Sequence, residues 1–564
     1  MAVFEEYKYE RPDVEAVNKQ FAAAFKSFQS ATSAEEAEKA ADRINDLRKH
    51  LDSLFNLVEI RHTVNTEDRF YKRENDFMDE TMPIFEGKTT EYYKLLMDSP
   101  FRGELEEKWG KQLFALAEAQ LKSFSPEIIP LMQQENKWAS KYTRRVAAAK
   151  IPFEGEERTL AQLGPFMESE DRATRKAASE ARFGYFAEHE EEFDEIYDRL
   201  VKIRTEIAHK LGFANYADLS YYRMSRIGYD KAMVADYRES IRKYVVPVAN
   251  KLYERQRKRI GTDKLYIYDE PFTFKTGNAK PKGNAEWILK NGEQMYHELS
   301  PETDQFFHFM QDHHLMDLMA TKGKAGGGYC TYIFDYQSPF IFSNFNGTAG
   351  DIDVLTHEAG HAFQVYTTQS DIPEYRWPTY EGAEIHSMSM EFFTWPWMKL
   401  FFKEDTEKRK FAHLSEALLF LPYGVSVDEF QHVVYEHPEM TPAERKLAWK
   451  KIEKKYLPHR NYDGFDYLER GGFWQRQSHI YEDPFYYIDY TLAQVCAFEF
   501  WKKSQEDYHS AWKDYLHLCR QGGSQSFLDL VRTAGLVSPF EKGCVESTLS
   551  AVASWLDQVD DRKL

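Results

Sequence analysis

The residues with the clearest chemical potential lie between positions 350 and 366, where the chain reads GDIDVLTHEAGHAFQVY. On an α-helix, His357 and His361 would share one face about 6 Å apart along the axis, so both imidazoles could bind one Zn²⁺. Glu358 would lie roughly 100° around the helix from His357, beside the metal, where a carboxylate can take a proton from water. No further histidine follows at the spacing of a metzincin, so the third ligand must come from another segment. The motif predicts a hydrolytic metal centre with one Zn²⁺ per chain.

The next acidic cluster is the most suitable source of that ligand. Residues 379–393 read TYEGAEIHSMSMEFF and place Glu381, Glu384 and Glu391 at spacings of three and seven. Such spacings put them on one helical face. Glu384 is the predicted zinc ligand, as in His₂Glu catalytic sites. Glu381 and His386 remain alternatives, and Glu391, two turns on, could orient a ligand imidazole by a hydrogen bond.

The helix that carries the two histidines has features of its own. Asp351 or Asp353 is predicted to cap its start. Gly360 costs roughly 1 kcal/mol of helix propensity relative to alanine. That cost is justified if another segment approaches the helix closely at this point.

Most of the remaining sequence is predicted to be helical. Residues 33–55 and 190–211 carry apolar side chains at spacings of three and four, which is typical of helices with one buried face. Residues 323–348 differ, because two short aromatic runs, 329–334 and 340–345, flank a turn and predict a β-hairpin. A second β-like patch is expected at residues 265–273.

Composition excludes several classes of protein. The 564 residues carry a formal charge of −19, which argues against binding nucleic acid or anionic membranes. Four scattered cysteines offer no disulfide framework. We see no basic-then-apolar leader and no run of about 18 apolar residues, so the expectation is a cytoplasmic protein.

Four motifs together resemble a known family. GGGYCTY, PFIFSNFNGT, HEAGHAFQ and AEIHS, in this order along the chain, are similar to the oligoendopeptidase F branch of the thimet oligopeptidase family. These are zinc peptidases of the gluzincin type, and the resemblance extends to Pz-peptidases. The motif-level similarity covers about residues 320–495. A thermolysin-like spacing would make Glu381 the ligand, whereas the AEI context favours Glu384.

The resemblance implies a fold that is mainly α, with a two-lobed helical body around a deep substrate channel and a small β-sheet beside the zinc-binding helix. We expect residues 1–165 to form an N-terminal helical region of the channel wall and residues 166–564 to form the catalytic region. An edge strand of the sheet would pair with the substrate backbone. The corresponding residues here are Gly326, Gly327, Gly328 and Tyr329, and glycines allow a peptide to approach the main chain.

A second constellation lies in RGGFWQRQSHIYEDPFYYIDYTLAQ, residues 470–494. In the family, a histidine and tyrosines of a matching segment bind the substrate carbonyl and stabilise the oxyanion. The best match assigns this role to His479 and Tyr490, assisted by Tyr487 or Tyr486. The chemistry fits, because a phenol O–H or imidazole N–H can donate to the charge that builds on the carbonyl oxygen.

These inferences predict a zinc endopeptidase that hydrolyses short peptides, with tolerance of collagen-type Gly-Pro-X sequences implied by the resemblance. Oligopeptides are the expected partners, without nucleic acid or membrane. An exopeptidase such as a dipeptidyl carboxypeptidase and a non-catalytic peptide-binding protein remain alternatives. The oligomeric state stays open, and a monomer is compatible with the sequence.

Overall fold

The computed structural model describes residues 2–564 as a mainly α-helical protein with two small sheets, which confirms the predicted fold class. The N-terminal helices are α1 Val14–Gln29, α2 Ala34–Val64, α3 Arg69–Met97, α4 Arg102–Trp109, α5 Lys111–Ser123 and α6 Ile129–Ala147. The middle helices are α7 Gly164–Met167, α8 Arg172–Glu188, α9 Glu190–Lys210, α10 Tyr216–Arg223, α11 Lys231–Tyr244, α12 Val246–Ile260, α13 Ala285–Leu299 and α14 Pro301–Asp312. The C-terminal helices are α15 Gly350–Thr367, α16 Tyr380–Phe393, α17 Met398–Phe402, α18 Thr406–Glu436, α19 Pro442–Tyr456, α20 Asp466–Glu469, α21 Ser478–Glu482, α22 Tyr487–Glu506, α23 Tyr508–Gln521, α24 Phe527–Thr533 and α25 Cys544–Gln558.

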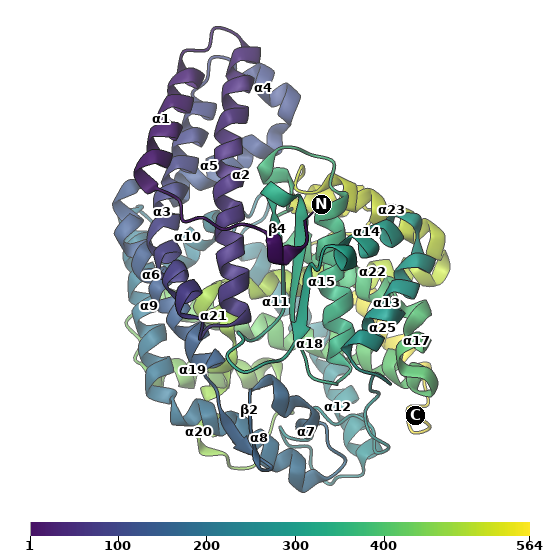
Figure 1. Cartoon of the computed structure of the whole chain (residues 1–564). Coiled ribbons are helices and arrows are strands. Elements are labelled where there is room, and N and C mark those ends of the chain that lie inside the picture. Colours follow the sequence, from purple (N-terminus) through teal and green to yellow (C-terminus); the bar gives the residue numbers. More distant parts are fainter. Residues whose placement is uncertain (1) are drawn as a thin grey trace.

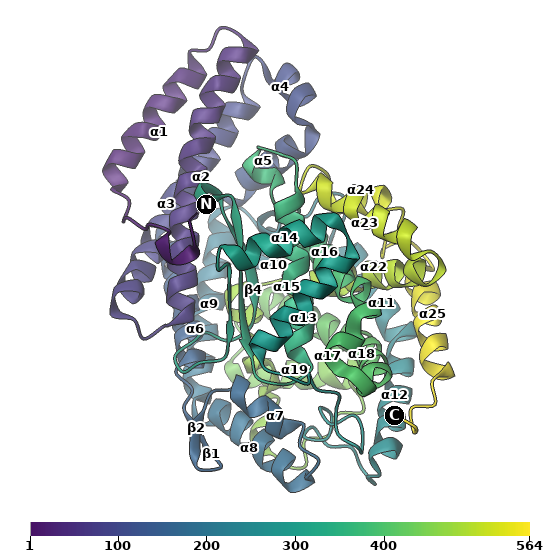
Figure 2. The same cartoon turned by 45° about the vertical axis from the view of Figure 1, so that its right-hand side comes forward.

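The N-terminal helices form a projecting bundle. Figures 1 and 2 show α1 and α2, in purple, rising from one side of the molecule, while the yellow C-terminal helices lie on the other. The bundle has a small apolar core of its own, to which Tyr375 from the loop between α15 and α16 also belongs. The Tyr375 hydroxyl accepts a hydrogen bond from the backbone N–H of Leu113 and donates one to the backbone carbonyl of Trp109. The loop that joins the two metal-motif helices is thereby anchored to the bundle. The division of the chain at residue 165 stays a prediction.

Beside α15 lies a three-stranded sheet in the order β3-β5-β4 (Figure 1). β4 Tyr329–Ile333 pairs antiparallel with β5 Ser338–Phe345, and Gln337 in the turn has a φ of 46°. The predicted hairpin is confirmed. β3 Met316–Met319 pairs parallel with β5 and was not predicted. A separate two-stranded hairpin, β1 Ile151–Phe153 with β2 Glu156–Arg158, interrupts the helices near residue 155.

Neither predicted aspartate caps α15. The helix begins at Gly350, and Ala349 at its N-cap offers no side-chain cap. Asp351 instead accepts from the backbone amides of Asn346 and Gly347, at 2.9 and 2.8 Å, and so holds the loop before the helix. Asp353 pairs with Arg409 of α18 at 2.6 Å.

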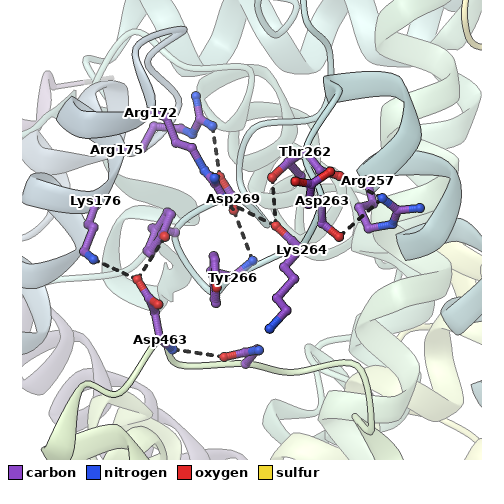
Figure 3. Close-up of polar contacts among 12 residues, drawn as sticks. Arg172, Arg175, Lys176, Arg257, Thr262, Asp263, Lys264, Tyr266, Asp269 and Asp463 are labelled. Carbon is purple, nitrogen blue, oxygen red and sulfur yellow. Dashed lines mark hydrogen bonds and ion pairs between the residues drawn. The ribbon is translucent and has the colours of Figure 1, made fainter.

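The predicted β-like patch at residues 265–273 is wrong, since these residues form an irregular loop. A buried carboxylate organises it (Figure 3). Asp269 accepts from Arg172 and Arg175 of α8, at 2.6 and 3.0 Å, and from the backbone amide of Tyr266. Charge-assisted hydrogen bonds of this kind outweigh the local preference of aromatic residues for strands.

Helices α15 and α16 cross in close contact at Gly360, as the sequence predicted. A Cβ added there would lie 2.7 Å from both the carbonyl oxygen of His386 and the Cα of Ser387. Both atoms belong to the backbone of α16, so the helix itself would have to move.

We therefore expect Gly360→Ala to lower the free energy of unfolding by about 1–3 kcal/mol, the usual cost of overpacking, and to weaken zinc binding because it displaces α16. Chemical unfolding and metal content measure the two effects. Gly184→Ala in α8 is the matched control, since a Cβ there meets nothing within 4 Å. A Gly360→Ala protein with wild-type stability and zinc content would contradict the close-packing argument.

Among residues 2–564, none of the helices combines the length and apolarity that a membrane span requires.

Candidate metal centre

Three side chains from α15 and α16 converge as the sequence predicted. Glu384 Oε2 lies 3.2 Å from His357 Nε2 and 3.3 Å from His361 Nε2. These three residues are the one group of potential ligands within residues 2–564 that meets the distance requirement for a shared metal ion. His361 and Glu384 are buried, and His357 is partly buried.

The spacing of these atoms suits zinc. Two ligand atoms bonded to one tetrahedral Zn²⁺ at about 2.0–2.1 Å lie about 3.3–3.4 Å apart. The observed contacts of 3.2 and 3.3 Å agree with that separation. Two imidazoles and one carboxylate also leave a fourth position open, which is the arrangement of catalytic zinc sites.

Both carboxylate oxygens of Glu384 accept hydrogen bonds from neighbouring side chains. Ser387, one turn along α16, donates to Oε2 at 2.7 Å, and Tyr486 donates to Oε1 at 2.5 Å. Burial would raise the pKa of Glu384, but the adjacent imidazoles of His361 and His357 hold the pKa well below its usual range. The group therefore stays ionised, as a metal ligand must.

Behind His357 runs a chain of hydrogen bonds with a defined direction. The indole N–H of Trp395, which can only donate, bonds His413 Nδ1 at 2.8 Å. His413 Nε2 must then carry the proton that it donates to Glu391, at 2.8 Å. The other oxygen of Glu391 lies 2.7 Å from His357 Nδ1, so His357 donates there and its Nε2 keeps a lone pair for a metal. Burial would raise the pKa of Glu391, but hydrogen bonds from the two histidines lower it to about 2.

Glu358 lies beside the predicted zinc ligands, and its Oε2 atom makes no hydrogen bond within residues 2–564. Its side chain is buried. Burial raises the pKa of this carboxyl. A Cβ added at Gly328 would lie 3.3 Å from Glu358 Oε1, so the glycine-rich segment that precedes β4 passes close to the carboxylate.

The alternative ligands lie elsewhere. Glu381, in the first turn of α16, accepts from the Tyr229 hydroxyl at 2.9 Å. His386 bonds the carbonyl of Gly382 through Nδ1 at 2.8 Å. Neither residue belongs to the convergent group.

The tyrosine and histidine cluster lies next to the metal ligands at the start of α22. His479 Nε2 and the Tyr490 hydroxyl are 3.0 Å apart. Burial lowers the pKa of His479 to about 4 and raises that of Tyr490 well above its usual range, so both are neutral near pH 7. The Tyr486 ring stacks on Tyr490 with centroids 4.9 Å apart, while Tyr487 packs edge-on against His479 at 5.0 Å.

The glycine-rich segment leads into an edge strand. β4 pairs only with β5 among the described residues, which leaves its other edge without a strand. Asn56 of α2 donates to the Tyr332 carbonyl at 2.9 Å and so covers the far end of that edge. Asn344 of β5 donates to the carbonyl of Gly327, and Tyr329 bonds Thr63 of α2 through its hydroxyl, at 2.7 Å.

Several residues at the site were not predicted. They are Ser387, His413, Trp395, Tyr423, Gln477 and Arg476. Ser387 could have been found from its place one turn after Glu384. Gln477 stands two residues before His479, but its role depends on Tyr423, which lies 54 positions away.

Comparisons with known proteins agree with this geometry. Residues 165–548 match the model of Peptidase family M3, and residues 4–124 match the Peptidase M3 N-terminal domain. This chain is similar to the solved structure of Pz peptidase A with inhibitor 2. The alignment covers 99% of this chain and 100% of that one, with 64% sequence identity and a TM-score of 0.99.

Two curated relatives are more distant. An oligoendopeptidase F homolog of Borreliella burgdorferi is 23% identical over 408 residues, which are 70% of this chain and 66% of that protein. Chromosomal oligoendopeptidase F of Lactococcus lactis subsp. cremoris is 24% identical over 415 residues, 69% and 65% of the two chains. The match thus spans just under two thirds of each relative's length.

Because the family model covers more than half of the sequence and the convergent histidines and glutamate lie within the matched region, the chain belongs to peptidase family M3, a family of zinc metallopeptidases.

Proposed function

We propose that this protein is a zinc endopeptidase that hydrolyses internal bonds of short peptides. The observation that carries the proposal is the convergence of His357, His361 and Glu384 beside the uncommitted oxygen of Glu358. Gly328, the residue before β4, lies close to that carboxylate, and the outer edge of β4 carries no paired strand within residues 2–564. A peptide added to this edge as a further strand would bring a backbone carbonyl to the site.

Each residue then has one task. His357, His361 and Glu384 would hold Zn²⁺, which would supply a Lewis acid that makes water nucleophilic near neutral pH. Glu358 takes a proton from the attacking water and passes it to the leaving amine. Tyr490, with His479 behind it and Tyr486 or Tyr487 beside it, donates to the carbonyl oxygen as negative charge develops. Glu391 orients His357, and Gly326, Gly327, Gly328 and Tyr329 bind the substrate backbone.

The restriction to short substrates follows from the channel that the resemblance implies. A deep channel would admit an extended peptide and exclude a folded domain.

The first test uses an internally quenched peptide with both ends blocked and a central Gly-Pro sequence, which the resemblance to Pz-peptidases suggests. We expect cleavage inside the peptide, loss of that cleavage with a chelator, and recovery when zinc is added back. Blocked ends exclude an exopeptidase, which requires a free terminus. Protein carrying Glu358→Gln, purified identically, controls for a contaminating peptidase.

The other outcomes are equally informative. If zinc-loaded protein cuts only peptides with a free end, the endopeptidase proposal is wrong and an exopeptidase replaces it. If it binds peptides without cutting any of them, the protein is a peptide-binding member of the family. The cytoplasmic location and the oligomeric state stay predictions from the sequence.

A further inference from the structure

A second chain of hydrogen bonds runs from Tyr423 to the phenol of Tyr490. The Tyr423 hydroxyl lies 2.8 Å from Gln477 Oε1, and Gln477 Nε2 lies 2.8 Å from His479 Nδ1. His479 Nε2 lies 3.0 Å from the Tyr490 oxygen. Arg476 packs over the Tyr423 ring, 5.5 Å from its centroid, and its charge lowers the pKa of Tyr423 against the stronger effect of burial.

The direction of this chain follows from its first hydrogen bond. The Tyr423 hydroxyl donates to the carbonyl oxygen of the Gln477 side chain, which can only accept. The carbonyl oxygen of the Gln477 amide faces Tyr423, and its NH₂ group therefore faces His479. The amide donates to Nδ1, which must carry no proton.

This arrangement fixes the tautomer of the imidazole. In the neutral ring the proton is on Nε2, from which His479 donates to the oxygen of Tyr490. The phenolic hydrogen of Tyr490 is then free to point away from His479. Tyr486 does not donate to that oxygen, because its own hydroxyl donates to Glu384 at 2.5 Å.

The opposite tautomer would have the opposite consequence. With the proton on Nδ1, the Nε2 lone pair of His479 would accept the phenolic hydrogen of Tyr490. That hydrogen would no longer be available to a substrate, and an oxyanion would meet only the lone pairs of the phenol. Which of two neutral forms the ring adopts therefore decides whether Tyr490 can stabilise developing negative charge.

We propose that Gln477, held by Tyr423, is a positioning residue that sets His479 in its Nε2–H tautomer and thereby keeps the Tyr490 hydroxyl available as a donor to the substrate carbonyl. The inference rests on the proposed role of Tyr490 in catalysis and adds to it a group outside the reacting atoms. Gln477 acts through His479.

The direct test is the tautomer itself. In zinc-loaded protein with ¹⁵N-labelled histidine, the shifts of the two ring nitrogens of His479, assigned by comparison with His479→Gln, distinguish the two neutral forms. We expect protonated Nε2 and unprotonated Nδ1 in the wild type. A proton on Nδ1 in the wild type would overturn the proposal without any variant of Gln477.

Kinetics on the blocked peptide provide the second test. Gln477→Met keeps the length of the side chain but removes the donor, and we expect kcat to fall about 10- to 50-fold with little change in KM and in zinc content. Tyr423→Phe should give a smaller loss of the same kind, because the amide can then rotate. Tyr296→Phe is the matched control, since that buried hydroxyl has no hydrogen-bond partner within residues 2–564.

The decisive comparison repeats Gln477→Met in a Tyr490→Phe background. We expect Tyr490→Phe alone to lower kcat by about 100-fold or more and the second substitution to add less than about twofold, because the tautomer matters only through the phenol. An equal loss from Gln477→Met in both backgrounds would show a merely structural role and overturn the proposal. If Tyr490→Phe keeps the wild-type kcat, the proposed catalytic role of Tyr490 fails first, and the inference fails with it.

Discussion

Replacing Glu358 with glutamine is expected to lower kcat on the blocked peptide by about 10²- to 10⁴-fold, the range that a general base contributes, while zinc stays bound. The expectation follows from two features of the carboxylate. It lies beside the three ligands without belonging to them, and one of its oxygens has no hydrogen-bond partner within residues 2–564. Glutamine preserves the shape of the side chain and removes its ability to accept and return a proton.

The pKa of Glu358 sharpens this expectation. Burial raises it, which makes the carboxylate a better proton acceptor than an exposed glutamate. The effect of the substitution should therefore fall on kcat, whereas KM and the stability of the protein should change little. Steady-state kinetics, metal content and thermal unfolding separate these quantities.

A matched control is available in Glu499. Burial raises the pKa of this carboxyl too, and it accepts from the backbone amide of Val537 at 2.7 Å. Glu499→Gln should leave both kcat and zinc content unchanged, since the amide oxygen can accept the same bond. If Glu358→Gln retains more than about a tenth of the wild-type kcat, another group supplies the base.

The local parts of the site could be predicted from the sequence because they depend on helix geometry alone. His357 and His361 share a face by their spacing, and Glu358 must lie beside them. The rotation of α16 is different. It is set by the contact of Gly360 with the backbone of Ser387, and it decides which glutamate faces the histidines.

Longer-range features had no signal in the sequence. β3 is a four-residue strand that exists only because it pairs with β5. The loop at residues 265–273 has aromatic residues typical of a strand, yet arginines from another helix hold Asp269 within it. Residues that meet only in the tertiary structure produce no periodic pattern in the sequence from which the contact could be predicted.

The two hydrogen-bond chains at the site share a physical principle. One begins at Trp395 and reaches the ligand His357, and the other begins at Tyr423 and reaches Tyr490. Each begins with a donated proton, from the Trp395 indole in the first chain and from the Tyr423 hydroxyl in the second, and this fixes the position of every later proton in the chain. The first chain leaves a lone pair directed at the metal position, and the second leaves a hydrogen free for the substrate. A lone pair at the end of the first chain suits a metal cation, and a hydrogen-bond donor at the end of the second suits the negatively charged oxygen of the reacting carbonyl.

The second large effect is expected from Glu384→Gln, which should weaken zinc binding by about 100-fold or more and reduce activity in proportion to the zinc lost. The carboxylate supplies the negative charge among the three ligands, and Ser387 and Tyr486 fix both of its oxygens. An amide would lose the charge and present an NH₂ group to one of these partners. Zinc content after dialysis against a zinc buffer, and competition with a chelator of known affinity, measure the change.

Glu381→Gln is the matched control because it lies one turn earlier on the same helix and is equally buried. Its carboxylate accepts from Tyr229, away from the histidines, so zinc binding should stay at the wild-type level. The pair of variants decides between the two glutamates that the sequence left open. If Glu381→Gln loses zinc while Glu384→Gln keeps it, α16 is displaced along its axis by three residues, about 4.5 Å, relative to this structure, and the contact at Gly360 must then differ as well.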